Sequence, residues 1–224
     1  MASLTTLQTY LERYALSSLE KQDKLESVTG GHMHEFDLAA GTIRFNDLLF
    51  PVQVIGTESY NTLNWLWAWA DEQSEVPASL LQSAVQLRIW GAEAGIPEFT
   101  LPSVDLNRTD GQAIAMIAAE VCKASCYYQD SYEGGALYLL ISDRIIDSQP
   151  SFDRQRLLSR LADLLSRYEL NHRIAVLSYL TEKGLSPVAQ RNMISCELES
   201  GERLLAEFDD AGRLVVVNGA AFEI

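Results

Sequence analysis

The stretch NTLNWLWAWAD, residues 61–71, decides the fold prediction. Trp65, Trp67 and Trp69 recur at every second position, so a β-strand would place the three rings on one face of a sheet. A helix would instead rotate each ring by about 200° from the one before. The smaller side chains between the tryptophans would lie on the opposite face. The spacing therefore predicts a strand whose tryptophan face contributes to a hydrophobic core.

Short runs separated by turn residues precede this strand. Residues 32–38, 42–46 and 47–59 carry apolar and β-branched side chains in partial alternation, and Ala-Ala-Gly at 39–41 divides the first two runs. Turns at such close spacing are typical of antiparallel hairpins. Together with the tryptophan segment, these runs predict an antiparallel meander of about four strands.

Helical periodicity flanks the meander. Apolar residues at helical spacing predict helices over residues 4–25, 78–94 and 110–128. The apolar run at 136–142 predicts a further, central strand. We expect these helices to cover the meander sheet.

A joint is predicted near DSQP, residues 147–150. Leucines at helical spacing then predict a hairpin of two helices within residues 151–184. Three strands follow, divided by ESGE and DDAG turns, at residues 193–198, 203–208 and 213–218.

The predicted fold class is α+β, an antiparallel β-meander sheet packed against helices, with a C-terminal helical hairpin and a second β-meander. Residues 1–148 are predicted to form an α+β core domain. Residues 149–224 form the C-terminal part, which either stands apart or packs with the core as one globular unit.

The charge of the chain is strongly acidic. Its 224 residues include 31 acidic and 17 basic side chains, a net charge of −14. Such a surface repels nucleic acid and anionic membranes, so we expect neither as a partner. The charge favours a basic protein partner, or serves only to keep the protein soluble. The sequence leaves the oligomeric state open.

The cysteine content and the N-terminal sequence predict a cytoplasmic protein. Three cysteines do not make a disulfide framework, and MASLTTLQTYLERY lacks the basic and apolar regions of a signal peptide. No apolar run approaches the roughly 20 residues of a membrane-spanning helix. No phosphate-binding loop, dinucleotide fingerprint or serine-hydrolase elbow occurs, so we expect no cofactor and assign no catalytic residue.

The tryptophan strand is also the candidate ligand site. The polar residues Glu58, Tyr60 and Asn61 stand at one end of it, and Asp71 stands at the other. A binding pocket needs largely apolar walls with a few convergent polar groups, which this segment could supply. Two interpretations stay open, in which Trp65, Trp67 and Trp69 either fill a core or line a pocket.

A metal site has only weak candidates. His32 and His34 would share one face of a strand, which is a spacing that metal ligands use. No H-x-x-x-H or C-x-x-C motif supports them, so no metal is expected. Cys122 and Cys126, four residues apart, are interpreted as part of a small-residue helix face.

Two blocks, VQVIGTESYNTLNWLWAWAD (52–71) and CYYQDSYEGGALYLLI (126–141), resemble an uncharacterised bacterial domain family. Its markers are a Gly-Thr/Ser-Glu-Ser turn, a Trp-x-Trp-x-Trp-Ala strand and a Tyr-Tyr…Glu-Gly-Gly strand entry. The resemblance covers about residues 30–142. Members usually carry Asn where this chain has Asp71, which puts a role for that position in doubt. The resemblance implies no activity, cofactor or catalytic residue.

Three functions fit these observations. The first is a protein-binding module, of an immunity or regulatory type, with no evident catalytic machinery. The second is a small-molecule-binding protein or an undescribed enzyme with a tryptophan-lined pocket. The third is an oligomeric scaffold that pairs through an exposed strand at residues 213–218.

Overall fold

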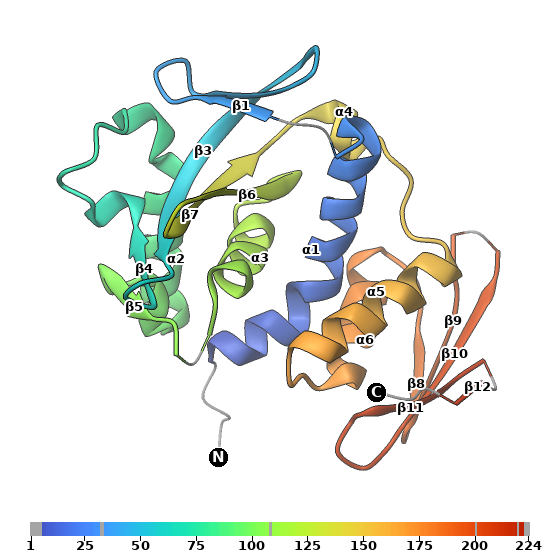
Figure 1. The fold of residues 1–224 in the computed structure, drawn as a ribbon. Coiled ribbons are helices and arrows are strands. Elements are labelled where there is room, and N and C mark those ends of the chain that lie inside the picture. Colours follow the sequence, from blue (N-terminus) through green and yellow to red (C-terminus); the bar gives the residue numbers. More distant parts are fainter. Residues whose placement is uncertain (1–5, 32–33, 108, 200, 219, 222–224) are drawn as a thin grey trace. The chain divides into compact units, whose positions relative to one another are not determined.

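The computed structural model describes residues 6–31, 34–107, 109–199, 201–218 and 220–221 (Figure 1). The fold is α+β with antiparallel sheets, as predicted. The chain forms two compact units, one built mainly from Lys21–Gln149 and the other from Gln8–Glu20 with the residues from Pro150 onward. Helix α1 (Leu7–Thr29) contributes to both. The division into domains 1–148 and 149–224 stays a prediction.

The long strand β3 organises the sheet of the first unit. Strand β3 (Leu48–Ser59) pairs with β2 (Thr42–Phe45) near its start and with β4 (Asn64–Trp67) near its end. It also pairs with β7 (Gly135–Ile141) over most of its length. The outer strands are β1 (His34–Asp37) beside β2, β5 (Ser103–Asp105) beside β4, and β6 (Cys126–Tyr132) beside β7.

The tryptophan strand is shorter than predicted. Strand β4 ends at Trp67, and Trp69 lies in a 3-10 helix over Ala68–Ala70. Pro102 accepts a hydrogen bond from the Trp67 amide at 3.1 Å, but proline has no N–H with which to continue the ladder. The expectation of three tryptophans on one strand face is therefore wrong for Trp69.

The predicted tryptophan core is present for the other two rings. Trp65 and Trp67 are fully buried and meet edge to face, with ring centroids 5.3 Å apart. Gly56, opposite Trp67 in the ladder, makes room for them, because a Cβ at Gly56 would lie 2.5 Å from the Trp65 ring. The Trp67 indole N–H donates to the carbonyl of Glu98 at 2.8 Å.

Two main helices accompany this sheet. Helix α2 (Gln82–Ala94) buries Ala84, Leu87 and Gly91, as its sequence pattern predicts. Helix α3 (Gly111–Val121) begins at Asp110, whose carboxylate accepts the Ala113 amide at 2.6 Å. Short elements complete the unit: 3-10 turns at Ala78–Leu80 and Pro97–Phe99, and α4 (Arg144–Asp147).

The helix predicted over residues 110–128 ends early. Lys123 has a left-handed backbone with φ of 53°, and residues from Cys126 onward pair with β7 instead. Tyr127 and Tyr128 therefore lie on a strand. The pairing of β6 with β7 overrides the local helical pattern, because tertiary packing outweighs intrinsic propensity.

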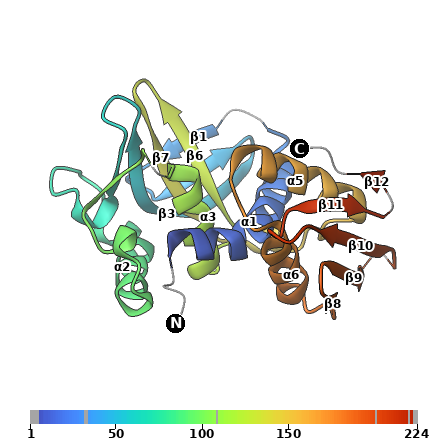
Figure 2. The same cartoon turned by 90° about the horizontal axis from the view of Figure 1, so that it is seen from below.

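The second unit contains the predicted helical hairpin and meander. Helices α5 (Arg154–Arg167) and α6 (His172–Glu182) precede a five-stranded antiparallel sheet in the order β12-β11-β10-β9-β8 (Figure 2). The strands are β8 (Val188–Gln190), β9 (Met193–Glu197), β10 (Arg203–Phe208), β11 (Leu214–Val217) and β12 (Ala220–Ala221). Strand β11 pairs with β10 on one side and, at Val216 and Val217, with β12 on the other, so this half of the segment 213–218 is not an exposed edge.

Candidate functional site

Two turns meet at one end of the first unit's sheet. The turn between β3 and β4 includes Tyr60 and Asn61, and the turn between β6 and β7 includes Gly134. The Tyr60 amide donates to the Gly134 carbonyl at 2.9 Å. A Cβ at Gly134 would lie 3.0 Å from the Asn61 side-chain nitrogen. We call Tyr60, Asn61, Leu63, Tyr132 and Glu133 together the sheet tip.

The sheet tip exposes large apolar and aromatic side chains. Tyr60, Leu63 and Tyr132 are 46%, 50% and 54% exposed. Leu63 also has a left-handed backbone with φ of 50°, which a side chain with a Cβ disfavours. The Leu63 carbonyl accepts the Leu106 amide at 2.9 Å, so the loop after β5 holds this conformation in place.

Acidic residues are frequent in the segments that form and adjoin the sheet tip. The described residues of the segments 56–67, 103–111 and 126–135 include five acidic side chains: Glu58, Asp105, Asp110, Asp130 and Glu133. Arg108 lies outside the described residues. This end of the sheet is therefore rich in negative charge beside exposed aromatic rings.

Glu58 is held rigidly next to the sheet tip. The buried Tyr138 hydroxyl donates to a Glu58 carboxylate oxygen at 2.6 Å. Burial, followed by the hydrogen bond to Glu58, raises the pKa of Tyr138, so this tyrosine stays protonated. A Cβ at Gly111 would lie 2.6 Å from the same oxygen, which places Glu58 at the N-terminal end of α3. The helix dipole there favours its negative charge.

A chain of amides fixes the Tyr60 ring. Gln112 of α3 donates to Gln129 of β6 at 3.0 Å, and Gln129 donates to the Tyr60 hydroxyl oxygen at 3.2 Å. Tyr60 accepts this bond, so its own hydroxyl proton is free to point elsewhere. The ring is thus exposed but oriented.

The structure separates the predicted ligand residues into three groups, of which the first is the fully buried pair Trp65 and Trp67. Glu58, Tyr60 and Asn61 belong to or adjoin the sheet tip, whereas Trp69 and Asp71 lie past the far end of β4. The Trp69 ring packs under the Arg88 guanidinium, with 4.2 Å from the guanidinium carbon to the ring centroid. Asp71 accepts the Gln73 amide at 3.1 Å and stabilises a turn. A ligand-binding role for the predicted set stays a prediction.

His34 engages both of its ring nitrogens. Its Nε2 lies 2.9 Å from an Asp130 carboxylate oxygen, and its Nδ1 lies 2.8 Å from the Tyr128 hydroxyl. Burial and the nearby Asp130 charge raise the pKa of Tyr128, so its hydroxyl stays protonated. His32 lies outside the described residues. Within the described ranges, no group of three or more metal-ligating side chains could hold an ion.

The thiols of the first unit are poor nucleophiles. Burial raises the pKa of Cys122 to about 11, and burial also raises the pKa of Cys126. A thiol reacts as its thiolate, so neither side chain is activated for catalysis. Both are free cysteines, but the predicted helix face is wrong for Cys126, which lies on β6.

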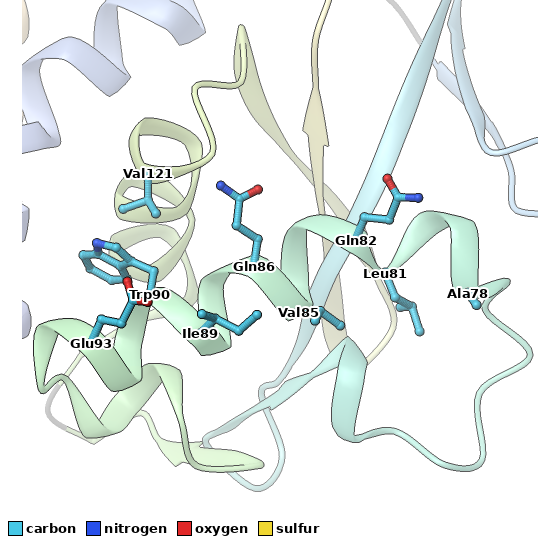
Figure 3. Close-up of a pocket in the computed structure, with 9 residues that line it drawn as sticks. All are labelled: Ala78, Leu81, Gln82, Val85, Gln86, Ile89, Trp90, Glu93 and Val121. Atoms are coloured by element: carbon cyan, nitrogen blue, oxygen red, sulfur yellow. The ribbon is translucent and has the colours of Figure 1, made fainter.

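A groove along α2 is a second feature that the sequence interpretation missed. It has a volume of about 560 Å³ and is lined mainly by α2, with Val121 of α3 on the other side (Figure 3). Val85, Ile89 and Trp90 provide apolar walls. The signal was visible in the sequence as a second apolar stripe, Leu81, Val85 and Ile89, next to the buried one.

Comparison with known proteins places the chain in a family. A family model described as "Family of unknown function (DUF6882)" matches residues 8–144. The chain belongs to this family. No curated protein and no solved structure matches it.

The DUF6882 match confirms the predicted resemblance to an uncharacterised domain family. It extends across the strands of the first unit, and so includes both turns of the sheet tip and the whole α2 groove. Residues 145–224 lie outside the match. Across the described part of this DUF6882 protein, no helix combines the length and apolar character needed to cross a membrane.

Proposed function

We propose that this chain is a bacterial, cytoplasmic protein-binding module of an immunity or regulatory type, and that its sheet tip binds a basic partner protein. Leu63 carries the proposal. A left-handed leucine costs about 1–2 kcal/mol relative to an ordinary backbone, and its side chain remains half exposed. A partner that covers Leu63 would remove its exposed apolar surface from water, which favours binding.

The neighbouring side chains support a basic partner. Tyr60 and Tyr132 are amphipathic rings of the kind that dominate protein interfaces, and an arginine can stack on either. Glu58 and Glu133 supply negative charge beside them. The net charge of −14 would attract a basic protein over a longer range.

The alternative functions have less support. A pocket lined by Trp65 and Trp67 would need exposed indole surface, and both rings are fully buried. A scaffold that pairs through residues 213–218 would need a free edge, and β12 already pairs with Val216 and Val217 there. The cytoplasmic assignment draws on the free thiols of Cys122, Cys126 and Cys196.

Affinity capture from host cells at the native expression level tests the proposal. The wild type is compared with Leu63→Asn/Tyr132→Ser and with Val215→Asn, a control at an exposed valine of the second unit. We expect a stoichiometric basic protein with the wild type and the control, and its loss with the tip variant. Equal recovery by all three proteins, or no partner at all, would refute a binding role for the sheet tip.

A further inference from the structure

Helix α2 has an apolar stripe on its outward face. Leu81, Val85 and Ile89 recur at a spacing of four residues, and Val85 and Ile89 are 44% and 56% exposed. The opposite stripe of the helix, which includes Ala84 and Leu87, packs into the first unit. Helix α2 is thus apolar on both faces. On the outward face Leu81 packs partly against the core, whereas Val85 and Ile89 are left exposed.

The outward stripe lines the groove shown in Figure 3. Ala78 and Leu81 lie at one end of it, Trp90 and Glu93 lie toward the other, and Val121 approaches from α3. The helical part from Gln82 to Glu93 is about 17 Å long at 1.5 Å per residue. A volume of about 560 Å³ spread over this length suits a row of side chains from a chain segment.

The charge in the groove is at its Glu93 end. Glu93 lies in the last turn of α2, and that turn contains no basic residue. The negative end of the helix dipole therefore adds to the Glu93 carboxylate, and both attract a cation. The other polar side-chain groups of the lining are neutral: the amides of Gln82 and Gln86 and the indole N–H of Trp90.

We propose that this groove is a second binding site, which receives an amphipathic helix of a partner protein. The helix would place apolar side chains at a spacing of three or four residues over Leu81, Val85 and Ile89. A lysine or arginine at one end would pair with Glu93. The sheet tip and the groove are formed by different residues, so a module with both could hold two protein segments.

Fluorescence anisotropy with two synthetic peptides tests the proposal on the full chain. Each labelled peptide is an amphipathic helix with leucines at positions 2, 6 and 9, a length of about three turns. One peptide carries lysine in its last turn and the other carries glutamate there. We expect the lysine peptide to bind more tightly than the glutamate peptide to the wild type.

Matched variants locate the binding. Val85→Gln/Ile89→Gln, which keeps good helix formers on α2, should weaken the lysine peptide at least about ten-fold. Glu93→Gln should weaken the lysine peptide about three-fold and leave the glutamate peptide no weaker. Val215→Gln, at a similarly exposed valine of the second unit, and Leu63→Asn should bind like the wild type.

Three outcomes would overturn the groove proposal and leave the proposal for the sheet tip unaffected. They are no binding of either peptide, equal binding by the wild type and Val85→Gln/Ile89→Gln, or indifference to the charge at the peptide end. A fourth outcome comes from analytical ultracentrifugation of the free protein, which measures its self-association. Self-association that Val85→Gln/Ile89→Gln abolishes would assign the groove to a second copy of the chain.

Discussion

Tyr179 donates its hydroxyl to the carboxylate of Glu20 at 2.5 Å, although the two residues are 159 positions apart in the sequence. Lys183, which caps the C-terminus of the same helix, also donates to Glu20, and the Phe152 amide donates to it at 3.2 Å. Glu20 is only 1% exposed. The second unit therefore surrounds a buried carboxylate with three donors, which is the condition under which burying a charge is tolerated.

Acid should destabilise the second unit through Glu20. Burial raises the pKa of Glu20, but the hydrogen bonds from Lys183 and Tyr179 outweigh it and hold the pKa below the ordinary value of 4.5. A carboxyl group whose pKa is lowered by folding stabilises the folded state at pH values above its ordinary pKa. This stabilisation is lost as the pH falls through the folded-state pKa. Urea unfolding followed against pH should show this loss below about pH 4.5.

The Glu20→Gln substitution isolates the effect. It should cost about 3 kcal/mol at neutral pH, because it breaks a buried pair. It should also flatten the acid dependence, whereas Glu207→Gln, at an exposed position of β10, should change neither quantity. An unchanged acid slope in Glu20→Gln would refute the assignment.

His172 should add a second pH dependence at higher pH. The Leu214 amide donates to its Nδ1 at 2.8 Å, and burial lowers the pKa of His172 below the ordinary 6.5. The folded state therefore favours the neutral ring. Its contribution is complete above pH 6.5 and is lost as the pH falls from 6.5 toward the folded-state pKa. His172→Gln should remove that slope from the unfolding free energy, and the same slope in both proteins would contradict this account.

Leu63→Asn should separate folding from binding. Asparagine tolerates the left-handed backbone better than leucine, so the variant should be more stable by about 0.5–1 kcal/mol while partner binding falls. Thermal unfolding measures the first quantity and affinity capture the second. Leu49→Asn, at a similarly exposed strand leucine, should give no such gain. A destabilised Leu63→Asn would show that the backbone there carries no strain.

Gly56→Ala should test the packing beneath the tryptophan strand. A Cβ at this position would meet the Trp65 ring at 2.5 Å and the Leu66 carbonyl oxygen at 2.6 Å. One contact is with backbone, so the cost should reach at least about 3 kcal/mol. Thr57→Ala on the same strand should cost much less. Similar denaturation midpoints for the two variants would rule out the close approach.

The thiol of Cys122 should react slowly with alkylating reagents in the folded protein. Its pKa of about 11 leaves little thiolate at pH 8, and unfolding should return it to ordinary reactivity. Mass spectrometry of iodoacetamide-treated protein, native and in urea, measures the ratio of the two rates. Equal rates would contradict this account, because they would show that folding neither shields Cys122 nor raises the pKa of its thiol.

The spacing of apolar residues was sufficient to predict those helices and strands whose structure depends mainly on their own sequence. The stripe with Ala84 and Leu87 predicted α2, and the leucines of residues 151–184 predicted the helical hairpin. The alternation of Trp65 and Trp67 predicted a buried strand. In each case a single segment must hide its own apolar face, and the spacing of that face is written in the sequence.

The candidate site could be predicted only in part. Glu58, Tyr60 and Asn61 stood out as a polar turn, but its meeting with the turn after Tyr132 did not, because nothing local indicates that two distant turns meet. The outward stripe of α2 was visible, yet its exposure depends on which of two apolar faces the sheet covers. Periodicity identifies a face without saying what packs on it.

The sequence by itself determined the α+β class, the acidic charge, the main helices and the buried tryptophan strand. Tertiary structure decided where β4 ends, that Tyr127 and Tyr128 join a strand, and that Leu63 is held exposed in a left-handed conformation. The physical reason is the sequence distance over which each kind of interaction acts. Side-chain periodicity acts between neighbours in the chain, whereas strand register, the partner of a buried charge such as Glu20, and the meeting of turns depend on residues brought together only by the fold.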